Sequence, residues 1–255
     1  MLEKLRQRAS RAIAPLLDRD AMPEPVEFIN LNGTRARAFV PGPWPKKRAR
    51  TALTKDPEMV RWLDKLGPDD LFWDIGANVG IYSLYAALRQ KCRVYAFEPG
   101  AANYYVLNRN IELNRAHDMI TALCVAVAEK SEFDVLNMRQ TVPGYSLSTF
   151  GQPIGERGQT FVPRFKQGMV SFSLDDLADK LPAPTHIKID VDGIDLQILF
   201  GGAKMLKNPK LRSLIVELDP ERPELLVQAK AFLEPHGLRF SHAYEPQWDY
   251  VFVRE

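Results

Sequence analysis

The sequence is poor in cysteine and has no long hydrophobic run. Its 255 residues include two cysteines, Cys92 and Cys124, both in apolar segments, so we expect no disulfide framework. No stretch of about 18 apolar residues is present, which excludes a membrane-spanning helix. The first residues also lack the apolar core and cleavage site of a secretory signal. These absences together predict a cytoplasmic protein.

The net charge is small as well, +2 at pH 7, but basic residues are concentrated near the start. Residues 1–50 contain eleven Lys or Arg against five Asp or Glu, so we interpret them as a basic N-terminal extension of a domain at 51–255. A total charge this low argues against nucleic acid as a partner. Residues 2–16 have the pattern of a short basic amphipathic helix, either an ordinary solvated helix or a weak peripheral contact with an anionic membrane.

The segment before the predicted domain is rich in proline. Pro and basic residues crowd positions 41–48, which predicts an irregular connector. Asp56 and Pro57 then have the residue types of a helix cap and a first helical position. We therefore expect the first helix of the domain to start at about residue 57.

From residue 71 onward, short apolar runs alternate with helical stretches, which is typical of βαβ units. The pattern predicts an α/β fold with a mostly parallel sheet that ends in an antiparallel C-terminal hairpin. An insertion at about residues 133–172, with β-like runs at its two ends, interrupts the alternation. The expected strands lie at residues 71–75, 93–97, 120–127, 186–190, 214–217, 239–244 and 250–253.

The turn after the first predicted strand is a candidate ligand site. It reads Gly76-Ala77-Asn78-Val79-Gly80. In open parallel sheets ligands bind at the carboxyl ends of strands, and glycine lets the backbone turn sharply and approach a ligand closely. The following helix offers free N–H groups to an anion. The spacing is not the dinucleotide pattern Gly-x-Gly-x-x-Gly, because Asn78 stands where its second glycine belongs.

Two acidic residues extend this candidate site. Asp74 precedes Gly76 by two positions, and Glu98 ends the second predicted strand, about where acids that bind a ribose lie. The combination predicts a ligand with both a ribose and a carboxylate, such as S-adenosylmethionine, whose sulfonium charge suits an acidic neighbour such as Asp74. The alternative for Glu98 is that it caps the helix after Pro99.

Several motifs resemble those of the FkbM-type methyltransferases. They are TKDPE at 54–58, FWDIGANVG at 72–80, YAFEP at 95–99, LNRN at 107–110, SLDDL at 173–177 and IKIDVDG at 187–193. The resemblance covers residues 54 to about 219. It implies a Rossmann-like, seven-stranded methyltransferase fold with S-adenosylmethionine as the methyl donor. It also implies O-methylation of a hydroxyl on a sugar, glycan or small-molecule natural product. The candidate cofactor-binding residues are then Glu58, Asp74, Gly76, Ala77, Asn78, Gly80, Glu98 and Ala126.

The candidate catalytic residues are acids at the ends of the fourth and fifth predicted strands. A hydroxyl must lose its proton as it attacks the methyl group, so a base must lie within about 3 Å of it. We predict Asp190 as this base, with Asp192 and Glu217 as alternates, because the fourth strand ends beside the methyl donor in this architecture. We expect Lys188 and Asp192 to point away from Asp190. The alternative for Asp190 is a structural one, in which it only holds the turn at Gly193.

Other functions and sites have weaker support. The four histidines, at positions 117, 186, 236 and 242, lack metal-ligand spacing, and we predict no metal site. A nicotinamide-dependent oxidoreductase and a non-catalytic module that retains the fold are the competing functions, since fold alone does not decide function. Residues 139–168 are long and Gly-containing, so they are either a lid that closes over the acceptor site or a surface loop.

Overall fold

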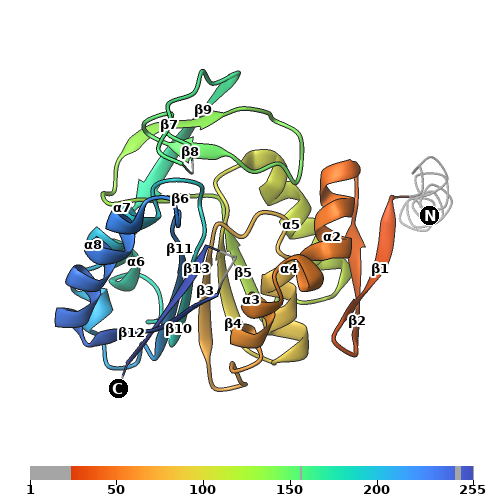
Figure 1. The fold of residues 1–255 in the computed structure, drawn as a ribbon. Helices are drawn as coiled ribbons and strands as arrows, with labels where there is room; N and C mark the ends of the chain where they lie inside the picture. Colours follow the sequence, from red (N-terminus) through yellow and green to blue (C-terminus); the bar gives the residue numbers. More distant parts are fainter. Residues whose placement is uncertain (1–23, 156, 245–247, 255) are drawn as a thin grey trace, which may run out of the picture.

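The computed structural model describes residues 24–155, 157–244 and 248–254 (Figure 1). The amphipathic helix predicted for residues 2–16 lies outside these residues. None of the helices within them is both long enough and apolar enough to cross a membrane.

A seven-stranded sheet forms the centre of the fold, as predicted. Its order is β12-β13-β11-β10-β3-β4-β5, and β13 alone runs in the direction opposite to the other six strands. The strands are β3 (Leu71–Ile75), β4 (Arg93–Phe97), β5 (Ile120–Leu123), β10 (His186–Ile189), β11 (Ser213–Glu217), β12 (Leu238–Tyr244) and β13 (Asp249–Arg254).

Helices cover both faces of this sheet (Figure 1). Strand residues alternate between the two faces: Phe72 belongs to one buried cluster, whereas Leu71 and Trp73 belong to the other. The first cluster includes α3 (Pro57–Leu63), α4 (Ile81–Leu84), the π-helical turn η1 (Tyr85–Arg89) and α5 (Ala101–Leu113). The second includes α6 (Leu174–Ala178), α7 (Asp195–Phe200), the short η2 (Met205–Lys207) and α8 (Pro223–Leu233), which η3 (Glu234–His236) extends.

The prediction of an irregular connector at residues 41–48 is wrong. A hairpin of β1 (Val26–Leu31) and β2 (Thr34–Phe39) leads into the 13-residue helix α2 (Pro43–Lys55). Pro43 and Pro45 occupy the first turn of α2, where the backbone N–H groups have no acceptor within the helix. These prolines therefore start the helix and do not break it.

The insertion forms a second, four-stranded sheet above the carboxyl ends of the central strands (Figure 1). Its order is β6 (Ala126–Val127), β9 (Phe165–Phe172), β7 (Phe133–Met138) and β8 (Ser148–Phe150). The single strand predicted for residues 120–127 is therefore wrong. β5 is an edge strand of the central sheet, and the chain leaves that edge after Leu123 to pair β6 with β9.

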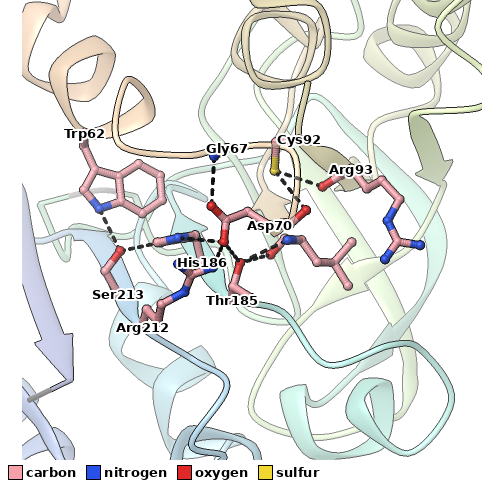
Figure 2. Close-up of polar contacts among 10 residues, drawn as sticks. Trp62, Gly67, Asp70, Cys92, Arg93, Thr185, His186, Arg212 and Ser213 are labelled. Atoms are coloured by element: carbon pink, nitrogen blue, oxygen red, sulfur yellow. Dashed lines mark hydrogen bonds and ion pairs between the residues drawn. The ribbon is translucent and has the colours of Figure 1, made fainter. Parts of the chain in front are cut away.

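A buried polar network joins the amino ends of β3, β10 and β11, at the opposite end of the sheet from the insertion (Figure 2). Asp70 accepts hydrogen bonds from the Thr185 hydroxyl at 2.8 Å and from Gly67 N at 2.8 Å. The Ser213 hydroxyl lies 2.7 Å from Nδ1 of His186. Burial lowers the pKa of His186 to about 4, so this side chain is neutral at pH 7. The network gives His186 a structural role.

Candidate active site

Two adjoining cavities lie at the carboxyl ends of the central strands. Cavity A extends over β4 and β6 and includes Glu98 and Ala126, whereas cavity B extends toward α2, Glu217 and Asp249. The residues that line both cavities are Arg48, Gly76, Asn78, Ser146, Asp190 and Asp192. The position agrees with the expected location of ligand sites in open α/β sheets.

The turn after β3 lies between the two cavities. Gly76 has φ of +80°, and a Cβ atom there would lie 1.8 Å from the carbonyl oxygen of Asp190, so only glycine fits beside the end of β10. Ala77 lines cavity B, and Asn78 lines both cavities. Gly80 lines neither cavity. A Cβ atom on Gly80 would lie 2.3 Å from Cδ1 of Leu107, so this glycine allows the turn to pack against α5.

Glu98 ends β4 and faces cavity A. Its carboxylate accepts hydrogen bonds from Asn78 N and Gly100 N, each at 2.8 Å. The side chain is buried, and burial raises its pKa to about 7 although these bonds act in the opposite direction. Its two oxygens hold the turn after β3 and the start of α5 in place. Oε1 also accepts a long, 3.4 Å hydrogen bond from Asn103 Nδ2, and Oε2 retains capacity for a further donor.

Asp74 lies beneath the cavities and lines neither of them. Its carboxylate accepts a 2.6 Å hydrogen bond from the Ser83 hydroxyl and lies 3.3 Å from Nζ of Lys188. Both side chains of this ion pair are 1% exposed. The structure therefore places Asp74 in contact with Lys188, and that ammonium separates it from the space where a ligand would lie.

Asp190 follows β10 and lines both cavities, with 38% of its side chain exposed. Its Oδ2 lies 3.2 Å from Nζ of Lys188, so the expectation that Lys188 points away from Asp190 is wrong. Alternate residues of an extended chain share one face, which brings these two side chains together. Burial would raise the pKa of Asp190, but the Lys188 ammonium and a hydrogen bond with Glu217 hold it below its ordinary value.

The two alternate acids lie beside Asp190. Asp192 lines both cavities, and its Oδ2 accepts a 2.6 Å hydrogen bond from Leu147 N. Glu217 lines cavity B, and burial with the negative charges of Asp190 and its neighbours raises its pKa well above the ordinary value. The turn at Gly193 is held by Asp195, whose Oδ2 accepts from Gly193 N at 3.0 Å. The structural role considered for Asp190 thus belongs to Asp195.

The remaining two predicted residues lie in different surroundings. Ala126 lines cavity A. Glu58 lies in α3, forms an ion pair with Arg61 on the same helix and lines neither cavity. Among the residues that the structure describes, no group of three His, Cys, Asp or Glu is placed to hold a metal ion.

Several residues that were not predicted to belong to the site line cavity B. Arg48, Thr51 and Lys55 come from α2, Asp56 follows this helix, and Asp249 is the first residue of β13. Burial, followed by the charge of Asp56, raises the pKa of Asp249 to about 8. Their positions could not be found in the sequence, because the proline-rich segment gave no indication of a helix that faces the site.

The cavities suit the parts of S-adenosylmethionine. In cavity A the Glu98 carboxylate, an acceptor for ribose hydroxyls, lies among the apolar side chains of Phe97, Val125 and Leu136, which could enclose an adenine ring. Within the described part of the chain, Asn78 Oδ1 is buried without a hydrogen-bond partner, which leaves an acceptor for a donor on a ligand. The acids shared by both cavities suit its ammonium and sulfonium charges.

The segment after β7 lies against both cavities. Tyr145 O accepts hydrogen bonds from the side chains of Asn78 and Asn103, at 3.2 and 3.1 Å. Arg48 Nε donates to Gly144 O at 2.6 Å, and Ser146 lines both cavities. The backbone of residues 144–147 is therefore tied to the turn after β3, to α2 and to Asp192.

We predict that residues 139–168 act as a lid. The hydrogen bonds that hold this segment converge on residues of the cavities, so simultaneous binding of cofactor and acceptor should slow tryptic cleavage after Arg157 and Arg164. Limited proteolysis followed by mass spectrometry measures this. Lys207 and Lys210 are exposed and line neither cavity, so cleavage there serves as the control. Equal cleavage of the segment with and without both ligands would show that it is a surface loop.

Comparisons with known proteins agree with this site. The chain is 27% identical over 191 residues to the hexuronic acid methyltransferase AglP of Haloferax volcanii, which is 71% of this chain and 72% of that protein. It is 29% identical over 151 residues to the methyltransferase sdnD of Sordaria araneosa, 50% of this chain and 58% of that protein.

The fold also has a counterpart among solved structures. The crystal structure of methyltransferase FkbM from Methylobacillus flagellatus superposes with a TM-score of 0.51 at 19% identity, over 74% of this chain and 44% of that chain. The model of the methyltransferase FkbM domain matches residues 74–240, more than half of the chain. The chain therefore belongs to the FkbM methyltransferase family, and S-adenosylmethionine is its methyl donor.

Proposed function

We propose that the chain methylates a hydroxyl group of a saccharide or a similar polyhydroxylated small molecule, with Asp190 as the general base. The observation that supports this most directly is the position of Asp190. It is a partly exposed carboxylate that lines both cavity A, which suits the cofactor, and cavity B, which is open to an acceptor, and unlike Asp192, which also lines both, its side chain does not hold the backbone of residue 147. The polar lining of cavity B suits an acceptor with many hydroxyls, and the relative named as a hexuronic acid methyltransferase supports a sugar.

S-adenosylmethionine supplies an electrophilic methyl group on a sulfonium. Glu98 binds the ribose hydroxyls, and Gly76, Ala77, Asn78 and Ala126 form the walls around the cofactor. The bound cofactor would supply its methyl group to the acceptor oxygen and leave as S-adenosylhomocysteine, and Asp190 would accept the hydroxyl proton as that oxygen attacks. Lys188 orients the Asp190 carboxylate, and Glu217, protonated because of its raised pKa, donates a hydrogen bond to it.

The proposed reaction is tested with a labelled methyl donor and a panel of neutral and acidic hexosides. Label should appear in a product that survives mild alkali, because a methyl ether is stable there whereas a methyl ester is hydrolysed. Family membership favours this reaction over hydride transfer. A product whose label is lost in alkali would replace hydroxyl methylation by carboxyl methylation, and label in no saccharide would reject this acceptor class.

We predict that Glu98→Gln weakens binding of S-adenosylhomocysteine by about 2 kcal/mol, because a carboxylate accepts charge-assisted bonds from two ribose hydroxyls and an amide does not. The wild-type affinity should also depend on pH. Glu98 has a pKa of about 7, so the carboxylate is lost, and the affinity falls, as the pH drops from 8 to 6. Isothermal titration calorimetry measures both effects. The affinity of the Glu98→Gln variant should not depend on pH in this range. If the variant binds S-adenosylhomocysteine as tightly as the wild type, Glu98 does not bind the ribose.

A further inference from the structure

Helix α2 forms one wall of cavity B. Arg48, Thr51 and Lys55 line the cavity from this helix, and their spacing of three and four residues puts them on one helix face. α2 precedes residue 74, at which the match to the family domain begins. Arg48 and Thr51 therefore lie outside the matched domain, whereas Lys55 belongs to the TKDPE motif at residues 54–58.

Charges of opposite sign line the two sides of cavity B. The cations Arg48 and Lys55 come from α2, and Asp56 follows that helix, whereas the carboxyl groups of Asp190, Asp192, Glu217 and Asp249 come from the strands and their ends. Burial raises the pKa of Asp56, and it raises that of Asp249 to about 8. Lys188 compensates the charge of Asp190 at 3.2 Å. Burial and the charge of Asp190 raise the pKa of Glu217 well above its ordinary value, which favours the neutral carboxyl group that can donate a hydrogen bond. The cavity thus combines a cationic wall with a floor of hydrogen-bonding carboxyl groups.

We propose that the α2 wall binds a carboxylate carried by the acceptor, so that the substrate is an acidic saccharide. Lys55 and Arg48 face the carboxylate, and the sugar hydroxyls face the strand-end acids, where Asp190 takes the proton of the hydroxyl that is methylated. This inference rests on the proposed function. Arg48 lines both cavities and also lies within reach of the cofactor site, whereas Lys55 lines cavity B and not cavity A. Lys55 therefore separates acceptor recognition from cofactor binding.

The experiment compares matched acidic and neutral sugars. Methyl glucuronoside and methyl glucoside, and the galacturonoside and galactoside pair, are titrated into the chain saturated with S-adenosylhomocysteine to measure binding. Initial rates of methylation of each pair are measured in separate reactions with S-adenosylmethionine. The wild type should bind and methylate the acidic sugar of each pair about tenfold better than the neutral one. This factor is what one charge-assisted hydrogen bond in an open site contributes to an equilibrium constant. Lys55→Met should bring this ratio close to one, while binding of the neutral sugars and of S-adenosylhomocysteine stays unchanged.

Lys47→Met is the matched control. Lys47 lies on the same helix, its Nζ is 5.4 Å from the centre of the Trp44 ring, and it lines neither cavity, so its removal should leave the preference unchanged. Lys55→Arg retains the charge and should restore the preference. Unfolding curves for each variant show that the helix is intact.

The outcomes distinguish the inference from the proposed function. If the wild type methylates saccharides but prefers the neutral members, or if Lys55→Met keeps the wild-type preference, the acidic-saccharide inference is wrong and hydroxyl methylation stands. If no saccharide of either kind binds or is methylated while S-adenosylhomocysteine still binds, the proposed function fails and the inference fails with it.

Discussion

Replacing Asp190 with Asn is expected to lower the turnover number by about 10²-fold or more, while S-adenosylhomocysteine still binds. The amide has nearly the same shape but cannot accept the acceptor proton. The pKa of Asp190 is held below its ordinary value, so the carboxylate is ionised at neutral pH and ready to act as the base. Single-turnover measurement of methyl transfer, with acceptor and cofactor both saturating, isolates this step from product release.

The neighbouring acids provide the controls for this assignment. Asp192→Asn should have a smaller effect on the chemical step, because its Oδ2 is already engaged by Leu147 N at 2.6 Å. Glu217→Gln keeps a hydrogen-bond donor beside Asp190 and should retain most of the activity. If Asp190→Asn turns over at the wild-type rate, positioning alone carries the reaction; if Glu217→Gln shows the large loss, Glu217 replaces Asp190 as the base.

The central strands could be predicted because each is a short, mostly apolar run, and β3, β10 and β11 are buried on both faces. β3 and β4 match the expected ranges at both ends. The segment of α2 was misread, since proline is a helix breaker at most positions and is compatible with a helix in the first turn. The break between β5 and β6 could not be predicted either, because it depends on the pairing of Ala126 with Ser171, far along the chain.

The site residues likewise divide into those that could be predicted from the sequence and those that could not. Gly76, Asn78 and Glu98 belong to local motifs at the ends of neighbouring strands, and the structure brings them together. Asp74 belongs to the same motif, but its surroundings depend on Lys188, which lies opposite it in the register of β3 and β10. No local pattern contains that pairing. The position of the site could therefore be predicted from local motifs, whereas the ion-pair partner of each charged residue could be identified only in the folded structure.

The buried lysine should have the largest effect on stability. Nζ of Lys188 lies between Asp74 at 3.3 Å and Asp190 at 3.2 Å and also donates to the carbonyl oxygens of Ile75 and Gly76, both at 3.3 Å. Lys188→Met removes the positive charge and leaves Asp74 buried without a counter-ion. We expect the free energy of unfolding to fall by about 3–5 kcal/mol, as measured by urea denaturation.

A surface lysine and a double variant show whether the buried charge causes this loss. The ion pair of Lys46 and Glu27, at 3.0 Å, is partly exposed, so Lys46→Met should cost less than about 1 kcal/mol. Adding Asp74→Asn to Lys188→Met should recover part of the lost stability, because it removes the uncompensated charge. If the double variant is as unstable as the sum of the two single variants, the loss comes from packing and not from the ion pair.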